Sequence, residues 1–299
     1  MSPRDTRRAC AGETVPRAHP VPLSTGGPGG NVLEWDVMRV HVVSDVHGNA
    51  EALARAGDGA DALVVLGDLI DFVDYTDYSG GILGRLFGAD NVATFATLRS
   101  RGDKEALASF AQSLWNSVDE PRTAVDDAIR EQYAELFGAV TAPTYATPGN
   151  VDAPELWKEL AGDLVETLDG DVVKIGGLRF GFIGGALRPP GAWPRRDAAW
   201  RPYLRTDEEF DAAVAGLGEV DVLCSHVPPD IADLTYDVVA RREERGSAGL
   251  LDHIRRHCPR WSLFGHVHQP LAHRYRLGKT ECRNVGYFKY SAQPYVLRW

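Results

Sequence analysis

The first regular pattern of apolar and polar positions begins near Met38. Residues 39–43 and 62–66 are apolar runs with the length and composition of buried strands. Between them, residues 49–56 have a helical pattern. A strand, a helix and a strand at this spacing predict a βαβ unit, and therefore a layered α/β sheet.

The pattern then becomes helical. From residue 103 to residue 139 apolar positions recur at helical spacing, and Pro121 separates two predicted helices. These helices lie in an acidic segment, residues 73–142, so we predict a helical insertion between two strands of the core. Two interpretations of the insertion stay open: a cap that packs on the core, or a gate over a substrate.

Strand-like runs return after residue 150. Gly176-Gly177 separates two of them and is typical of a hairpin turn, while residues 249–257 predict a helix. The predicted strands are residues 172–175, 178–183, 220–224, 261–264, 282–285 and 295–299. Because no internal repeat is visible, we predict one domain over residues 38–299.

The N-terminal segment differs in composition from the rest. Residues 1–37 are rich in Arg, Pro and Gly, and lack the apolar stretch of a secretory signal. Such a segment buries too little apolar area to offset the entropy of ordering it, so we predict a disordered tail there. The four cysteines include no CxxC pair, which favours a reducing compartment. No run of about 18 apolar residues occurs, so we expect a cytoplasmic protein without membrane contact.

Bulk composition narrows the class of partner. With 44% hydrophobic and 25% charged residues, the chain is typical of globular proteins. A net charge of -10 disfavours a broad surface for nucleic acid. A small nucleotide is compatible with this charge, because metal ions can supply positive charge locally. The sequence leaves the oligomeric state open.

Five short segments place metal-ligand residue types where predicted strands end. They are Asp45-Val46-His47, Gly67-Asp68, Gly149-Asn150, Ser225-His226 and Gly265-His266-Val267-His268. The crevice at the carboxyl ends of strands is where α/β sheets bind ligands, so distant segments can converge there. Within the two pairs spaced two residues apart, extended backbone points both side chains the same way.

The side chains in these segments form one ligand set of four imidazoles, two carboxylates and one amide. The seven are Asp45, His47, Asp68, Asn150, His226, His266 and His268. This mixture suits Mn, Fe, Zn, Co or Ni, and does not suit Ca or Mg alone. Seven ligands exceed the need of one ion and fit two ions that share a carboxylate. We therefore predict two divalent transition-metal ions, with manganese favoured, which can hold the attacking and leaving oxygens of a phosphoryl displacement.

The order of the segments resembles the calcineurin-like metallophosphoesterase superfamily. Its motifs D-x-H, GD-x-x-D, GN-x-(D/E), H and GH-x-H are matched by Asp45-Val46-His47, Gly67-Asp68-Leu69-Ile70-Asp71, Gly149-Asn150-Val151-Asp152, His226 and Gly265-His266-Val267-His268. Each motif alone is weak, but five in this order are specific. The resemblance implies a four-layer αββα sandwich, with which the predicted strands are compatible.

The resemblance also implies roles for individual residues. One ion would be held by Asp45, His47, Asp68 and His268, and the other by Asp68, Asn150, His226 and His266. Asp68 would bridge them, and a shared hydroxide would be the nucleophile, since metal binding can lower the pKa of water to about 7. Asp71 and Asp152 match acidic residues that act beside the ligands in catalysis. Arg188, in a loop after a predicted strand, is a candidate contact for the substrate phosphate.

One position departs from the family pattern. The histidine that usually follows Gly-Asn, and helps to protonate the leaving group, is replaced by Val151. Some relatives without this histidine act on phosphodiesters, and residues 246–251 loosely resemble the branch that cleaves cyclic nucleotides. We therefore expect a phosphoesterase for a small molecule, more specifically a phosphodiester or a cyclic nucleotide. The alternatives are a phosphoprotein phosphatase and a catalytically silent scaffold, but a scaffold would be expected to lose ligands.

Overall fold

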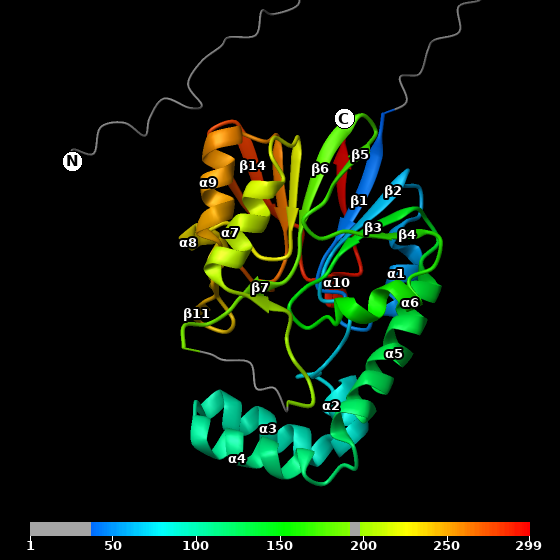
Figure 1. Ribbon diagram of the computed structural model, residues 1–299, viewed down its shortest axis with the longest axis vertical. Helices are drawn as coiled ribbons and strands as arrows, with labels where there is room; N and C mark the ends of the chain where they lie inside the picture. Colours follow the sequence, from blue (N-terminus) through cyan, green and yellow to red (C-terminus); the bar gives the residue numbers. More distant parts are fainter. Residues whose placement is uncertain (1–36, 192–197) are drawn as a thin grey trace, which may run out of the picture.

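The computed structural model describes residues 37–191 and 198–299. The predicted tail therefore lies, except for Val37, outside the described residues. In the described part, two mixed β-sheets pack face to face, and helices cover the outer face of each (Figure 1). This arrangement confirms the α/β class and the predicted αββα sandwich.

The first sheet has five strands in the order β15-β1-β2-β3-β4. They are β15 (Tyr295–Arg298), β1 (Arg39–Val43), β2 (Ala62–Leu66), β3 (Thr144–Thr147) and β4 (Val165–Thr167). Strands β1 to β4 run parallel, and β15 is antiparallel to β1. The carboxyl ends of β1, β2 and β3 therefore meet at one edge.

The second sheet has six strands in the order β13-β14-β12-β9-β6-β5. They are β13 (Arg274–Leu277), β14 (Thr280–Asn284), β12 (Trp261–Phe264), β9 (Val222–Ser225), β6 (Leu178–Ile183) and β5 (Val172–Ile175). Strands β6, β9, β12 and β14 are parallel, and the two edge strands are antiparallel to their neighbours. The central strands of this sheet also end at a common edge.

The central strands are buried on both faces. In β1, Val42 packs into the core between the two sheets, while Val43 faces the outer helices. In β9, Cys224 belongs to the same intersheet core and Leu223 to the outer one. Because alternate residues point to opposite faces and both faces are apolar, such strands appear in the sequence as continuous apolar runs.

Helices form the two outer layers. The first sheet is covered by α1 (Ala50–Ala56), α5 (Pro121–Ala139) and α6 (Trp157–Leu160), and the second by α7 (Asp207–Gly216) and α9 (Ala248–His257) (Figure 1). Helix α1 begins after Asn49, whose side chain accepts a hydrogen bond from the Ala52 N–H. Helix α7 begins with a capping box between Thr206 and Glu209.

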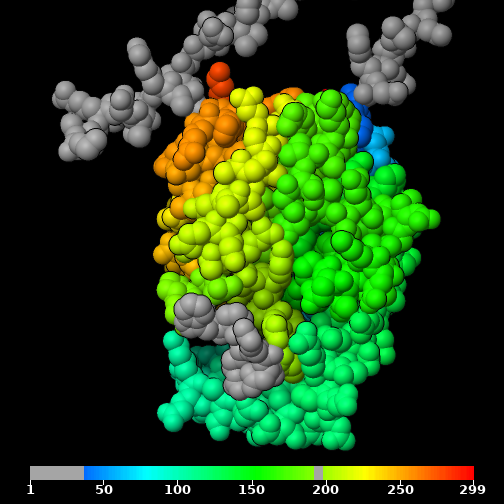
Figure 2. All heavy atoms as spheres, viewed as in Figure 1, coloured from blue at the N-terminus to red at the C-terminus, as the bar shows by residue number. Residues whose placement is uncertain are grey.

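The segment between β2 and β3 is helical. It contains α2 (Gly81–Phe87), α3 (Ala89–Arg101), α4 (Lys104–Trp115) and α5, which begins at Pro121. Proline is favoured at the first position of a helix, because its missing N–H needs no partner there. Helices α3 and α4 pack on each other and form the teal lower part of the surface in Figure 2.

Short elements complete the described chain. They are η1 (Pro154–Leu156), β7 (Ala186–Leu187), β8 (Leu204–Arg205), α8 (Ala232–Thr235), β10 (Tyr236–Asp237), β11 (Arg242–Glu243) and α10 (Phe288–Ser291). Of the strands in the two sheets, β3, β4 and β13 were not predicted from the sequence. Strand β3 is short and contains two threonines and a tyrosine rather than an apolar run. Strands β4 and β13 are edge strands with exposed or half-buried residues, so they also lack the apolar run that marks a central strand.

Candidate metal centre

All seven predicted ligands follow the carboxyl ends of five parallel strands. Asp45 and His47 follow β1, Asp68 follows β2, and Asn150 follows β3. From the second sheet, His226 follows β9, while His266 and His268 follow β12. The structure therefore brings the five sequence segments to one place, where the carboxyl edges of the two sheets meet.

Six of these side chains form two clusters of potential ligand atoms. One cluster is Asp45, His47 and His268, and the other is Asp68, His226 and His266. Within each cluster the ligand atoms all lie within 4.8 Å of one another.

In the first cluster, the Nε2 atoms of His47 and His268 are 3.4 Å apart, and His268 Nε2 lies 3.4 Å from Asp45 Oδ1. In the second, His226 Nε2 lies 3.2 Å from His266 Nδ1 and 3.1 Å from Asn150 Oδ1. Asn150 thus lies beside the second cluster, and its role as a ligand stays a prediction.

The carboxylate of Asp68 faces both clusters. Its Oδ1 lies 3.4 Å from His226 Nε2, and its Oδ2 lies 3.8 Å from His47 Nε2. One oxygen is thus directed to each group of ligands, which is the geometry of a bridging carboxylate. The backbone N–H of Val151 donates to Oδ1 at 3.0 Å and helps to orient the side chain.

The backbone is strained at four of the seven positions. Asp45, His47, Asp68 and His266 have φ values of 58°, 42°, 52° and 66°. Residues with a side chain rarely adopt this left-handed conformation, which costs of order 1–3 kcal/mol each. Since packing maintains that strain at residues that all point into one site, the strain itself indicates function.

Two motif glycines allow the loops to approach closely. A Cβ atom at Gly149 would collide with the carboxylate of Asp68, and one at Gly265 would collide with Ser44 and Asp45. Any larger residue would displace a predicted ligand. The glycines of the GN and GH motifs are therefore needed for space.

Backbone carbonyls orient two of the histidines. His226 Nδ1 donates to the carbonyl of Leu66 at 2.8 Å, and His47 Nδ1 donates to the carbonyl of Ile70 at 3.2 Å. With the proton on Nδ1, the Nε2 lone pair of each ring is directed into the site. This is the usual arrangement for histidines that bind metal.

The electrostatics of the donor set fit a cation. Asp45 Oδ1 is buried and makes no hydrogen bond with any described residue. Burial favours the neutral form of Asp68, but the imidazoles of His226 and His47 outweigh it and hold the pKa of Asp68 well below its usual range. Burial and then the neighbouring His226 lower the pKa of His266 to about 4. A buried carboxylate oxygen without a hydrogen bond, an ionised carboxylate and the neutral imidazole of His266 are a suitable environment for metal ions.

Comparison with known proteins identifies the family. The family of calcineurin-like phosphoesterases matches residues 38–270 of the chain. The chain belongs to this family. No curated protein matches the sequence.

Two solved structures support the fold of this phosphoesterase. One crystal structure is 14% identical, with a TM-score of 0.54, and the match covers 88% of this chain and 98% of that one. The protein TT1561 of Thermus thermophilus is 15% identical, with a TM-score of 0.51, and the match covers 87% of this chain and 98% of that one. At these identities the likeness extends to the fold alone. In the described part of the chain, none of the helices combines the length and apolar character of a membrane span.

The two acidic residues predicted to act beside the ligands have different surroundings. Asp152 is fully buried and accepts hydrogen bonds from the N–H groups of Gly149 at 2.8 Å and Leu69 at 3.0 Å. It therefore ties together the two loops that carry Asp68 and Asn150. Asp71 instead accepts a bond from Lys289 Nζ at 2.8 Å. A catalytic role for either residue stays a prediction.

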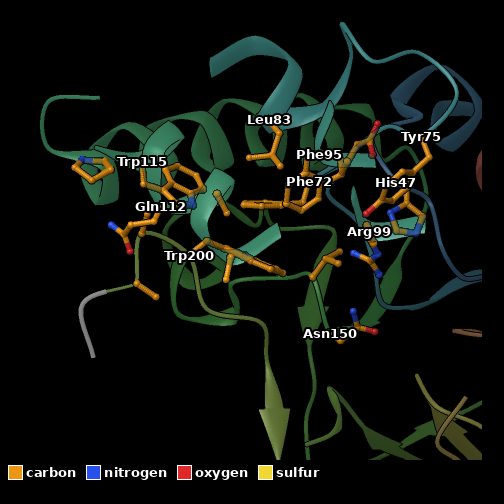
Figure 3. A pocket seen from close by; sticks show the side chains of 18 of the residues that line it. His47, Phe72, Tyr75, Leu83, Phe95, Arg99, Gln112, Trp115, Asn150 and Trp200 are labelled. Carbon is orange, nitrogen blue, oxygen red and sulfur yellow. The ribbon is translucent and has the colours of Figure 1, made fainter. Parts of the chain in front are cut away.

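The candidate metal centre opens into a large cavity, which we call the chamber. Its volume is about 900 Å³, and its walls include His47, Asn150 and His268. Val151 also lines it, so the residue that replaces the family's histidine faces this space. Figure 3 shows His47, Asn150 and Arg99 at one end and Trp115 at the other.

A second, polar cleft of about 500 Å³ meets the chamber. His47, Asp71, Lys289 and Tyr290 line both spaces. Arg188, the candidate contact for the substrate phosphate, lines neither the chamber nor the polar cleft. Its role stays a prediction.

Sequence reasoning missed three residues beside the ligands. They are Arg99 of α3, Tyr287 before α10, and Lys289 within α10. None belongs to a motif. A basic or aromatic residue outside a motif carries no local signal, because only the tertiary fold brings it to the site.

Proposed function

We propose that this phosphoesterase hydrolyses phosphodiesters with two divalent transition-metal ions, manganese favoured. The observation that supports this most directly is the carboxylate of Asp68, whose two oxygens face separate clusters of ligand atoms. Asp45, His47 and His268 would complete the site of one ion. Asn150, His226 and His266 would complete the other.

When bound, such ions supply a hydroxide nucleophile at neutral pH and neutralise charge on the phosphoryl oxygens. The protein's own contribution is positioning. The carbonyls of Leu66 and Ile70 orient two imidazoles, and Asp152 joins the loops of Asp68 and Asn150. The guanidinium of Arg99 lines the chamber and adds positive charge where an anionic ester would enter, while Lys289 is bonded to Asp71 and Asp74.

Two features favour a diester over a monoester. The chamber and the polar cleft meet at His47, so the two organic groups of a diester could each occupy one space. In addition, Val151 offers no proton for a leaving group. A monoester dianion with an alkyl leaving group depends most on such a donor.

The alternatives are less well supported. A phosphoprotein phosphatase needs an open surface for a peptide, whereas the chamber is lined largely by apolar side chains. A silent scaffold has no need for strained backbone at four predicted ligands. A cyclic nucleotide fits the same metal chemistry and belongs in any substrate panel.

The test uses the full chain loaded with Mn²⁺. Its substrates are bis(p-nitrophenyl) phosphate, p-nitrophenyl phosphate, cyclic nucleotides and a phosphopeptide. We expect hydrolysis of the diester to exceed that of the monoester, and His226→Ala to abolish both. His257→Ala, which changes an exposed histidine of α9, is the matched control. Activity on the phosphopeptide alone, or activity that survives His226→Ala, would reject the proposal.

A further inference from the structure

One end of the chamber is polar and charged, whereas the described side chains at the other end carry no charge. At the metal end, Lys289 bonds to Asp71, and the guanidinium of Arg99 lies 5.4 Å from the centroid of the Tyr75 ring. Figure 3 places Arg99 and Tyr75 near His47. The charged side chains that line the chamber are therefore gathered beside the metal centre.

The stretch of wall between the two ends is apolar. Phe72 and Trp200 stack with ring centroids 4.0 Å apart and 21° between the ring planes. Leu83 and Phe95 lie on the same stretch of wall, between the metal end and Trp115 (Figure 3). A stretch of this kind provides contacts for a hydrocarbon group and no partner for an ionic one.

Helix α4 forms the far wall with one of its faces. Ala108, Ala111, Gln112 and Trp115 line the chamber at the spacing i, i+3, i+4 and i+7. Asn116 completes this wall, and its amide oxygen accepts a hydrogen bond from Gln112 at 2.9 Å. Among the described residues, this far wall thus carries no ionisable side chain, and its two amides share a hydrogen bond.

From this arrangement we infer that the substrate is an amphiphilic phosphodiester, one of whose ester groups is a long apolar chain that occupies the chamber. The inference rests on the proposed function, because the phosphate must lie at His47 and Asn150 for the chain to extend towards α4. A nucleoside suits the chamber less well. Its hydroxyl groups and base edges require hydrogen-bonding partners, whereas the walls beyond Phe95 are mostly carbon.

The volume supports the same class of ligand. A cavity of about 900 Å³ is near the upper end of the range for small-molecule sites, and a phosphate with two small groups would fill little of it. Each methylene buried in such a space strengthens binding, on the order of twofold to fourfold per group. Binding should therefore depend steeply on chain length until the far wall is reached.

The first experiment compares p-nitrophenyl alkyl phosphates with methyl, butyl, octyl and dodecyl chains, all below their critical micelle concentrations. In each reaction water adds its oxygen to phosphorus and the bond to p-nitrophenolate breaks, so the products are an alkyl phosphate and p-nitrophenolate. We expect kcat/KM to rise by at least about 10²-fold from methyl to octyl, mainly through KM. Thymidine p-nitrophenyl phosphate serves as the nucleotide comparison and should resemble the methyl ester.

The second experiment fills the chamber from α4. Ala111→Trp places a bulky ring against the far wall, and Ser109→Trp places the same ring at an exposed position of the same helix that does not line the chamber. Ala111→Trp should lower kcat/KM for the dodecyl ester at least tenfold and leave the methyl ester within about twofold. Ser109→Trp should change neither, and thermal unfolding of both variants checks their fold.

The outcomes separate this inference from the proposed function. If the loaded enzyme cleaves none of the esters, the proposed function fails. If it cleaves the methyl ester but gains nothing from longer chains, or prefers the thymidine ester, the phosphodiesterase proposal stands and the apolar substrate class is wrong. The chain-length series on the unmodified protein decides this even if Ala111→Trp does not fold.

Discussion

The phenol ring of Tyr287 stacks on the imidazole of His268, with ring centroids 3.8 Å apart and 16° between the ring planes. The same phenol ring meets His47 edge-on, at a centroid distance of 5.7 Å. Two predicted ligands of one cluster, which come from opposite ends of the chain, thus pack against one aromatic ring. That packing restricts how either imidazole can turn.

The first prediction follows from this contact. Tyr287→Ala should weaken metal binding by about tenfold or more, because residues that orient ligands typically contribute 10–100-fold to metal affinity. Tyr287→Phe keeps the ring and removes only the hydroxyl, so it should retain nearly normal affinity. Competition with a chelator of known affinity measures both variants. Equal affinities for the Ala and Phe variants would contradict a role for the ring.

The second prediction concerns Asp68. Asp68→Ala removes a carboxylate that faces both clusters, so the metal content should fall from about two ions per chain to less than one. Activity should fall by at least about 10²-fold. Asp90→Ala, an exposed position in the first turn of α3, is the control. Elemental analysis decides the matter: unchanged metal content in the Asp68 variant would refute the assignment of the bridge.

Most of the candidate ligands could be predicted to converge because they follow strands that the sequence also reveals; Asn150, which follows the unpredicted β3, is the exception. Residues 62–66 are a continuous apolar run, residues 39–43 and 261–264 are largely apolar, and the structure has β2, β1 and β12 at these positions. Parallel strands that end at one edge bring their following residues together. Here, local patterns and sheet geometry are sufficient to assemble Asp45, Asp68 and His268.

The surroundings of the ligands could not be predicted in this way. Lys289 reaches Asp71 across 218 positions of sequence, and it sits in α10, a helix of four residues. Arg99 belongs to α3, where only Val92 is buried, so no periodic core face indicates how the helix packs. Tertiary packing brings both residues to the site. The sequence of this chain alone carries no signal of that packing.

The third prediction is a pH dependence of stability away from the metal centre. In α9, burial and then the charges of His257 and Arg256 lower the pKa of His253 to about 4, from the ordinary value of 6.5. A histidine whose pKa is lower in the folded state favours folding fully above pH 6.5, and this stability is lost as the pH falls towards 4. His253→Gln cannot be protonated, so its Tm should decline less than that of the wild type over this range. Parallel Tm curves would contradict the assignment, and loss of metal at low pH affects both proteins alike.

The fourth prediction addresses the missing general acid. Val151 lines the chamber, and its backbone N–H donates to Asp68, so Val151→His would place an imidazole beside the phosphate without changing that bond. A positioned general acid contributes about 10²–10⁴-fold, most where the leaving oxygen is basic. The carboxylate of Asp152 already accepts bonds from Leu69 and Gly149. A new imidazole would therefore be held less firmly than in an evolved site, and we expect a gain of at most about 10²-fold.

This gain should depend on the leaving group. For p-nitrophenolate, which leaves without a proton, Val151→His should change kcat/KM by less than about threefold. For alkyl leaving groups the variant should be faster than the wild type, so that its plot of log kcat/KM against leaving-group pKa is less steep. Val151→Gln, a polar residue that cannot act as an acid, controls for polarity alone. If both the His variant and the wild type give the same slope, then another residue already donates the proton, or chemistry does not limit the rate. Either result would remove Val151 as the reason for a preference for diesters.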